Sequence, residues 1–336
     1  MRIKDARFDA RGVIAHPTVQ PAWFLFTIAR PPNIRPPVNV HLIDGTYELF
    51  RHFYAVPSRS DRAGREVGAL VGVLHSLLGM LEAGATHIGV ATDHVIESFR
   101  NDLWPGYKSS AGIDPALWAQ FHPFEGALAA MGVAVWPMVD LEADDGLASA
   151  ARLAGADPAV ERVFICTPDK DLSQCVSGTR IVQFDRRQRA LRDEEGVVDK
   201  FGVRPASIPD YLALVGDSAD GFPGIPGWGA KSTSTVLAHY GHLEAIPLRS
   251  LPWAVAVRGA ARLQKNLRTA WRDALLFRDL ATLRDDASLF DDLDELRWSG
   301  ATAGFERVAA SLGDARLAER VETIRSRGEA ESGPSL

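Results

Sequence analysis

The chain has 336 residues and a mass of 36.5 kDa, enough for one large domain or two ordinary ones. Hydrophobic residues make up 46% and charged residues 24%, and no apolar run reaches the ~20 residues of a membrane-spanning helix, so we expect no membrane partner. Two cysteines, Cys166 and Cys175, exclude a disulfide scaffold and favour a cytoplasmic location. The net charge of −6 excludes nucleic-acid binding by bulk charge alone, so basic residues would have to be clustered for that role.

The first segment of the chain differs from the rest. Residues 1–15 are polar with no clear period of a helix or strand, residues 23–28 form an apolar run of only six residues, and the proline-rich run RPPNIRPP follows at 30–37. Such a run favours extended backbone over packed structure. We therefore predict a disordered extension over residues 1–37.

Short strands and helices then alternate along the chain. Strands are predicted at the apolar runs 38–43, 87–91, 134–136 and 162–166. Helices are predicted at 46–54, 69–81, 125–131 and 142–154. This alternation predicts an α/β fold with a parallel sheet and helices on both of its faces.

Acidic residues gather where the predicted strands end or where a helix begins. They are Asp44, Asp93 and Asp169 after strands, Glu142, Asp144 and Asp145 at a helix start, and Asp217 and Asp220 in LVGDSADGFPG. A single aspartate at such a place is usually a helix cap or a turn residue. Several carboxylates crowded at one sheet edge repel each other, unless divalent cations neutralise them. Because ligands bind at the carboxyl ends of parallel strands, we predict a Mg²⁺ or Mn²⁺ site there.

Five motifs occur in order between about residues 38 and 285. They are LIDGTYELFRHFYAVP (42–57), ATDHVIESFRNDLWPGYK (91–108), LEADD (141–145), TPDKDL (167–172) and LVGDSADGFPGIPGWGAKS (214–232). Together they resemble the 5′-3′ exonucleases and flap endonucleases, and especially the N-terminal nuclease domain of bacterial DNA polymerase I. The resemblance implies a PIN-like nuclease core, and because no polymerase domain follows, we expect a stand-alone nuclease.

The family resemblance also implies two metal groups made from nine acidic side chains. The first group holds one ion mainly through Asp93, Glu142, Asp144 and Asp145, with Asp44 near both ions. The second group contains Asp169, Asp171, Asp217 and Asp220. Two Mg²⁺ ions, or Mn²⁺ in their place, about 4 Å apart could generate a hydroxide and neutralise the leaving oxygen of a phosphodiester.

Two basic residues resemble family residues at the base of an arch over the active site. Lys108 would offer a point charge to the scissile phosphate and Arg100 a planar fork, so both are predicted to be catalytic. Tyr107 is predicted to stack on an unpaired base of the DNA. The family often reads Tyr-Lys-x-x-Arg here, but Ala111 replaces the arginine, and residues 109–124 form a short segment. We therefore expect a reduced arch.

A glycine-rich hairpin, GIPGWGAKS at 224–232, lies between helices predicted at 208–215 and 231–240. Glycines allow close approach to a phosphate, and the second helix offers free N–H groups at its start. The hairpin resembles the helix-hairpin-helix-type duplex-binding element of the family, in which a K⁺ ion often bridges to a DNA phosphate. The predicted DNA-binding residues of the hairpin are Gly227, Gly229, Lys231 and Ser232.

A row of basic residues follows the hairpin, and we call it the basic stripe: Arg258, Arg262, Lys265, Arg268 and Arg272. At helical spacing these side chains share one face, whereas Leu263, Leu267 and Trp271 lie on the opposite face. A solvated helix face usually mixes charges of both signs, but this stripe contains no acid. We predict that it contacts the backbone of duplex DNA.

These observations predict four regions and one activity. The regions are the extension at 1–37, an α/β nuclease core at 38–199, a helix-hairpin-helix-type region at 200–290 and a helical tail at 291–336. The predicted protein is a monomeric 5′-3′ exonuclease and flap endonuclease that cuts DNA with 5′ flaps, nicks or branches by a two-metal mechanism. Two alternatives stay open: a branched-DNA-binding protein with weak catalysis, and a PIN-type ribonuclease.

Overall fold

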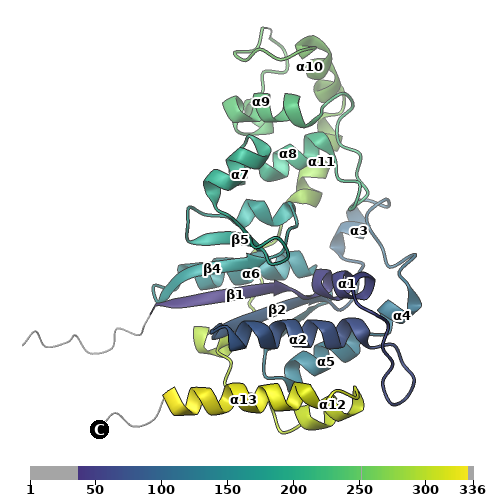
Figure 1. Ribbon diagram of the computed structural model, residues 1–336. Helices are drawn as coiled ribbons and strands as arrows, with labels where there is room; N and C mark the ends of the chain where they lie inside the picture. The colour runs from purple at the N-terminus through teal and green to yellow at the C-terminus, as the bar shows by residue number, and fades with distance from the viewer. Residues whose placement is uncertain (1–36, 251, 332–336) are drawn as a thin grey trace, which may run out of the picture. The chain divides into compact units, whose positions relative to one another are not determined.

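The computed structural model describes residues 37–250 and 252–331 (Figure 1). The predicted extension over 1–37 lies outside the described residues, except for residue 37. Among the described residues, no helix is both long and apolar enough to cross a bilayer.

The centre of the fold is a sheet of six strands within the described residues. The strands are β1 (Val38–Asp44), β2 (His87–Asp93), β3 (Ala134–Met138), β4 (Val160–Cys166), β5 (Ile181–Asp185) and β6 (Ala190–Arg192). Their order in the sheet is β3-β2-β1-β4-β5-β6, and all pairs are parallel except β5 with β6. The predicted α/β fold with a parallel sheet is confirmed, and an antiparallel strand is added at one edge.

Helices cover both faces of this sheet. On one face lie α1 (Gly45–Ala55), α2 (Gly68–Glu82) and α5 (Phe121–Ala130), and on the other lies α6 (Ala143–Ala156). Alternate residues of β1 enter different cores, because successive side chains of a strand point to opposite faces. Val40 and Leu42 belong to the core beneath α6, whereas Ile43 belongs to the core that contains α2 and α5. Burial on both faces explains why the strands read as short apolar runs.

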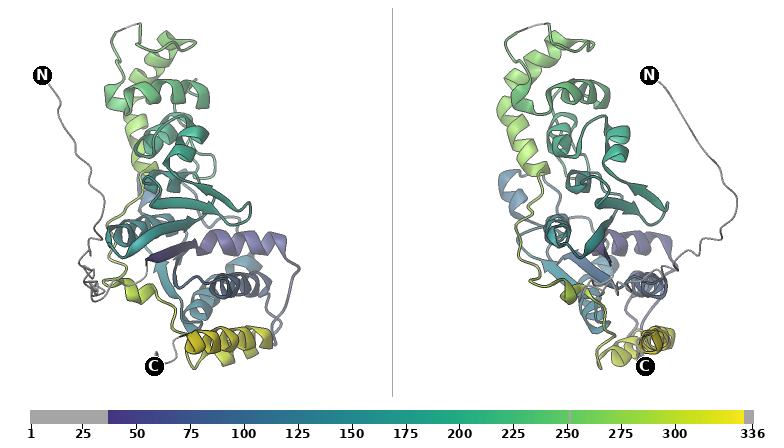
Figure 2. Two further views of the ribbon diagram at one scale, coloured as in Figure 1. Left: turned by 60° about the vertical axis from the view of Figure 1, so that its left-hand side comes forward. Right: turned by 90° about the vertical axis from the view of Figure 1, so that its left-hand side faces the viewer.

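Two helices near the C-terminus pack against the same core. They are α12 (Phe305–Ser311) and α13 (Ala315–Glu331), which contact α5 and α2 (Figures 1 and 2). Phe305 and Leu317 join the hydrophobic cluster of α2 and α5. The region predicted as a helical tail therefore contributes to the core around the sheet.

A second group of helices has its own hydrophobic core. It contains α7 (Glu194–Phe201), α8 (Ile208–Val215), α9 (Ala230–Tyr240), α10 (Ala260–Thr269) and α11 (Trp271–Ala281). Figures 1 and 2 place α8 to α11 on the far side of the sheet from α13. The predicted helices at 208–215 and 231–240 are confirmed as α8 and α9.

Several short elements connect these parts. They are α3 (Phe99–Leu103), α4 (Pro115–Trp118) and the 3-10 helices η1 (Asp171–Cys175), η2 (Pro205–Ser207), η3 (Leu243–Ala245) and η4 (Leu293–Leu296). The basic stripe does not lie on one helix as predicted: Arg258 precedes α10, Arg262, Lys265 and Arg268 lie on α10, and Arg272 lies on α11 after the chain bends at Ala270. The two helices have different partners: α11 packs on α8, whereas α10 contacts the glycine hairpin, as described below.

Candidate active site

The parallel pairing of β1 and β2 brings two predicted metal ligands to one edge of the sheet. Asp44 ends β1 and pairs in register with Ala91 of β2, which itself ends at Asp93. Asp44 also caps α1, because its Oδ1 accepts a hydrogen bond from Tyr47 N at 2.8 Å. Two carboxylates that are distant in sequence thus meet at the carboxyl ends of adjacent strands, where α/β folds bind ligands.

Three further segments bring acidic side chains to the same edge: the start of α6, the turn from β4 into η1, and the loop that follows α8. Electrostatic interactions connect these side chains with one another and with Asp44 and Asp93. We call this set the carboxylate cluster: Asp44, Asp93, Glu142, Asp144, Asp169, Asp171, Asp217 and Asp220.

Several acids of this cluster lie in an environment that disfavours negative charge. Burial, with added repulsion from Asp93 and Asp169, raises the pKa of Asp44 to about 7. Burial and neighbouring carboxylates also raise the pKa of Asp144 and of Asp171 well above the ordinary range. Bound cations would relieve the repulsion that these charges exert on each other.

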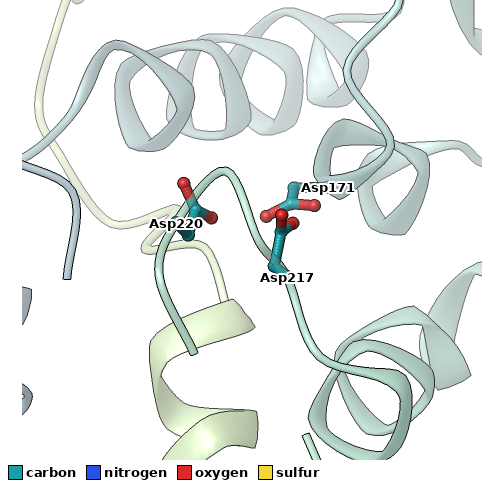
Figure 3. A group of neighbouring side chains, drawn as sticks. All are labelled: Asp171, Asp217 and Asp220. Atoms are coloured by element: carbon teal, nitrogen blue, oxygen red, sulfur yellow. The ribbon is translucent and has the colours of Figure 1, made fainter. Parts of the chain in front are cut away.

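The tightest group in the cluster is formed by Asp171, Asp217 and Asp220. Figure 3 shows their side chains close together, and one oxygen from each lies within 4.8 Å of the others. Asp171 Oδ1 is buried and has no hydrogen-bond partner among the described residues. Hard divalent cations take oxygen ligands, and a buried unpaired carboxylate oxygen is costly without one. The residues present therefore fit a divalent metal ion.

Lys108 lies between the two predicted metal groups. Its Nζ is 2.7 Å from Glu142 Oε2 and 3.6 Å from Asp220 Oδ1. Burial raises the pKa of Glu142, but the charges of Lys108 and Arg100 outweigh it, so the pKa of this carboxyl is lower than usual. Glu142 is thus ionised and oriented, with Ser98 Oγ donating to its Oε1 at 2.6 Å.

A second lysine, Lys170, enters the cluster from the turn before η1. Its Nζ forms an ion pair with Asp217. Burial alone would lower the pKa of Lys170, but Asp217 and the neighbouring carboxylates outweigh burial and raise this pKa. Lys170 is not among the predicted site residues, although its place between Asp169 and Asp171 in TPDKDL indicates it.

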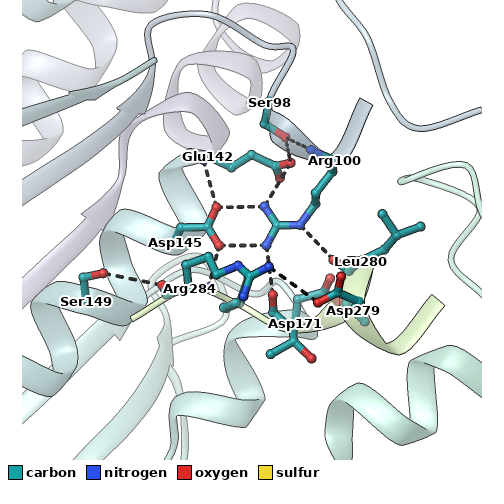
Figure 4. A network of polar contacts seen from close by, with 12 residues as sticks. Ser98, Arg100, Glu142, Asp145, Ser149, Asp171, Asp279, Leu280 and Arg284 are labelled. Atoms are coloured by element: carbon teal, nitrogen blue, oxygen red, sulfur yellow. Dashed lines mark hydrogen bonds and ion pairs between the residues drawn. The ribbon is translucent and has the colours of Figure 1, made fainter. Parts of the chain in front are cut away.

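Asp145 and Arg100 form a buried ion pair beside the cluster (Figure 4). Both Asp145 oxygens accept from the Arg100 guanidinium at 2.7 Å, and they also accept from the backbone N–H groups of Glu142 and Arg284. Both side chains are fully buried. The structure therefore places Arg100 against protein groups and not toward an open phosphate position, and it places Asp145 in contact with Arg100.

The predicted base-stacking residue is also buried. Tyr107 is 5% exposed, and its hydroxyl donates to Glu142 Oε2 at 3.3 Å. The chain from Trp104 to Asp114 is a loop whose Ser110 donates to Glu97 through both its N and its Oγ. The short segment predicted between Lys108 and α5 is therefore folded as this loop and the four-residue helix α4.

The glycine hairpin has the backbone that its sequence requires. Gly224 and Gly227 have φ of +70° and +84°, a region that glycine enters without steric cost. Gly229 caps α9, and its N–H donates to Ser232 Oγ at 3.1 Å. Lys231 is exposed at the start of the helix. The hairpin thus presents small residues, a helix N-terminus and one exposed cation on the same turn.

The hairpin and the basic stripe are neighbours. Trp228 Nε1 donates to Leu263 O at 3.1 Å, and Asn266 Nδ2 donates to Pro226 O at 2.7 Å, so α10 is attached to the hairpin. A side chain added at Gly227 would lie 3.8 Å from Arg262 Nε. All five side chains of the stripe are exposed, and within the described residues no ion pair involves them: Arg258, Arg262, Lys265, Arg268 and Arg272.

Two models of known protein families match most of the described chain. The family model described as "5′-3′ exonuclease, N-terminal resolvase-like domain" matches residues 39–202. A second model, "5′-3′ exonuclease, C-terminal SAM fold", matches residues 203–303. The first match contains the sheet and the second contains the hairpin and the basic stripe.

Curated relatives carry the corresponding names. The chain is 32% identical over 249 residues to a 5′-3′ exonuclease of Buchnera aphidicola, covering 73% of this chain and 81% of the relative. It is 34% identical over 265 residues to DNA polymerase I of Pseudomonas aeruginosa, covering 76% of this chain and 28% of the relative. The chain thus matches little more than a quarter of the length of that polymerase.

Solved structures share the fold at low sequence identity. A bacteriophage T5 5′-exonuclease with bound zinc has a TM-score of 0.59 at 19% identity, over 86% of this chain and 98% of the other. The catalytic core of Rad2 in complex with DNA substrate has a TM-score of 0.54 at 14% identity, over 85% and 92% of the two chains.

Proposed function

The chain belongs to the 5′-3′ exonuclease family, and we propose that it hydrolyses phosphodiester bonds near the 5′ ends of flapped, nicked or branched DNA with the help of two divalent metal ions. The observation that carries this proposal is the buried carboxylate cluster with Lys108 Nζ between its two parts. A site with this charge pattern suits a phosphate held between cations and a lysine.

The proposed metal ligands fall into two groups. Asp93, Glu142 and Asp144 would hold one ion, the second would lie near Asp169, Asp171, Asp217 and Asp220, and Asp44 would lie near both. Mg²⁺ is the proposed ion and Mn²⁺ its substitute, because both prefer the oxygen ligands present here. When bound, such a pair supplies an activated water and neutralises the attacking and leaving oxygens of an in-line displacement.

The chain itself supplies a positive charge and an oriented carboxylate for this reaction. We propose that Lys108 exchanges its contacts with Glu142 and Asp220 for a non-bridging oxygen of the scissile phosphate. Its 29% side-chain exposure supports this, because the ammonium can be reached from solvent. Glu142 stays oriented by Ser98 Oγ when the lysine moves, so the carboxylate keeps its direction toward the metal position.

Duplex DNA would be held away from the cut position. The hairpin residues Gly227, Gly229, Lys231 and Ser232 adjoin the exposed stripe through the Asn266–Pro226 and Trp228–Leu263 hydrogen bonds. We propose that the two form one continuous phosphate-binding surface, with K⁺ bound at the glycine hairpin as the family resemblance implies. We also propose a monomer, which light scattering of the purified protein would check.

The two alternative functions give different results with matched substrates. The assay compares release of a 5′ label from flapped DNA, nicked duplex, single-stranded DNA and single-stranded RNA, in Mg²⁺ and in EDTA. We expect Mg²⁺-dependent cleavage of the flapped and nicked DNA. Cleavage of RNA alone would support a PIN-type ribonuclease, and tight binding without cleavage would support a DNA-binding protein.

A pair of isosteric variants isolates the carboxylate cluster in the same assay. Asp171→Asn removes one charge beside Asp217 and Asp220, and the cleavage rate should fall by orders of magnitude. Asp199→Asn, at an exposed position of α7, is the control and should cut like the wild-type protein. Equal rates for all three proteins would contradict the proposed site.

A further inference from the structure

The largest fully buried side chain of the described residues is Arg100, and its partners lie on separate parts of the chain. Figure 4 shows its guanidinium directed at Asp145 on α6 and at Leu280 in the last turn of α11. Nε donates to Leu280 O at 2.8 Å and Nη2 to Thr282 O at 3.1 Å, while Nη1 and Nη2 each donate to an Asp145 oxygen at 2.7 Å. Arg100 therefore connects three segments in one contact.

This contact uses the full hydrogen-bonding capacity of both side chains. A guanidinium has five N–H donors, and with Glu142 Oε1 at 3.3 Å from Nη1 each donor of Arg100 has a protein partner. A carboxylate offers about four acceptor positions. Asp145 uses them for two bonds from Arg100, one from Glu142 N and one from Arg284 N. A phosphate or a metal ion could reach either side chain only by displacing these bonds.

The last two residues of α11 and the chain that follows them, residues 280–285, are the third member of the contact, and we call this segment the strap. Besides Arg100, the strap is held by Gln174 of η1, whose Nε2 donates to Ala281 O at 2.9 Å and whose Oε1 accepts from Leu283 N at 3.0 Å. The same Gln174 Nε2 also donates to Asp171 O at 2.9 Å. The strap is thus bound both to α6 and to η1, the two elements that present acids of the carboxylate cluster.

We propose that Arg100 is a positioning residue: through Asp145 it fixes the first turn of α6 against the strap, and so sets the direction of Glu142 and Asp144, instead of contacting the scissile phosphate. This inference rests on the proposed metal-dependent function. It assigns Asp145 to the support of the metal site and leaves metal contact to the other acids of that group. It also connects the metal site to the end of α11, the helix that carries Arg272 of the basic stripe.

The physical consequence concerns metal affinity. Removing a group that orients a metal ligand typically weakens metal affinity ten- to a hundredfold. Glu142 and Asp144 lie in or next to the turn that Asp145 closes, because Asp145 accepts from Glu142 N at 3.0 Å. Loss of Arg100 frees this turn to move, so Mn²⁺ should bind more weakly even when no DNA is present.

The test is a double-mutant cycle on Mn²⁺ binding to the full chain without DNA, with free Mn²⁺ measured by electron paramagnetic resonance. We expect Arg100→Gln and Asp145→Asn each to raise the Mn²⁺ Kd about ten- to a hundredfold. The double variant should lose no more affinity than the worse single variant, because both changes break the same contact. Arg152→Gln is the control, since this half-exposed arginine of α6 contacts the strap only at Asp285.

Two results would overturn the inference. Unchanged Mn²⁺ affinity in Arg100→Gln, with slower cleavage alone, would mean that Arg100 contacts the phosphate. Losses that multiply in the double variant would mean that Asp145 binds metal independently of Arg100. If Arg100→Gln fails to fold by circular dichroism, Arg100→Lys replaces it, because lysine keeps the charge but cannot make the paired bonds. The wild-type measurements test the proposed function separately. If the wild-type protein neither binds Mn²⁺ nor cleaves DNA, the proposed function itself is refuted.

Discussion

Replacing Lys108 with alanine should have opposite effects on metal binding and on the chemical step. The lysine ammonium lies 2.7 Å from Glu142 and 3.6 Å from Asp220, so in the free protein it competes with cations for two carboxylates. Two unit charges 4 Å apart interact by about 4 kcal/mol at an effective dielectric constant of about 20. Because the side chain is 29% exposed, we reduce this to about 1.4 kcal/mol, or about tenfold tighter Mg²⁺ binding.

The chemical step should become slower in the same variant. A positioned charge that stabilises a transferring phosphate contributes about 3 kcal/mol, so the single-turnover rate at saturating Mg²⁺ and DNA should fall about a hundredfold or more. Rapid-quench measurements over a Mg²⁺ series give both the midpoint and the limiting rate. Lys108→Arg keeps a positive charge and should retain more of the rate than the alanine variant.

Three results would contradict the role proposed for Lys108. A limiting rate like that of the wild-type protein would show that Lys108 takes no part in the chemistry. A weaker Mg²⁺ midpoint would show that Lys108 supports the carboxylate cluster and does not compete for it. A change in DNA affinity alone would reduce Lys108 to a docking charge.

Three further changes test other parts of the structure. Changing Arg262, Lys265 and Arg268 together to glutamine should flatten the slope of log affinity for duplex DNA against log salt concentration by about two to three units. Single-turnover cleavage at saturating DNA should change little. An unchanged slope in a fluorescence-anisotropy titration would exclude the stripe from DNA binding. Gly227→Ala places a side chain at φ +84°, so it should cost about 1–2 kcal/mol of stability by denaturant titration and weaken duplex binding; wild-type values for both would show that the hairpin conformation is not needed. Burial raises the pKa of Asp314, but hydrogen bonds from His75, Arg59 and Arg316 outweigh it and lower the pKa. The stability that the Asp314 carboxylate contributes is therefore present above about pH 4 and is lost as the pH falls further. The Tm difference between wild type and Asp314→Asn should shrink on acidification, and a constant difference would contradict this.

The sheet could be predicted from the sequence because its inner strands are buried on both faces. Every residue of β2 is buried, which gives the apolar run that marks this strand. The edge hairpin of β5 and β6 is not among the predicted strands, because the polar Gln183 interrupts the apolar run of β5. The Gln183 side chain is satisfied by Asp169 O and Ser173 Oγ, partners that only the folded chain supplies.

The candidate site was also predictable only in part. Carboxylates at the ends of parallel strands form a pattern that the sequence carries, because the topology alone brings strand ends together. The surroundings of Arg100 are not carried in this way, since its partner Leu280 lies 180 residues further along the chain. The bend at Ala270 could not be predicted from the sequence either, because no glycine or proline marks it and α10 and α11 have separate packing partners.

The most direct test of the two-metal site is anomalous diffraction from crystals of the protein soaked in Mn²⁺. We expect two anomalous peaks about 4 Å apart, one beside Asp93, Glu142 and Asp144 and the other beside Asp171, Asp217 and Asp220. The Arg100–Asp145 contact should persist in the same crystals. A carboxylate cluster without any peak at millimolar Mn²⁺ would contradict the proposed two-metal site, and with it the proposed nuclease mechanism.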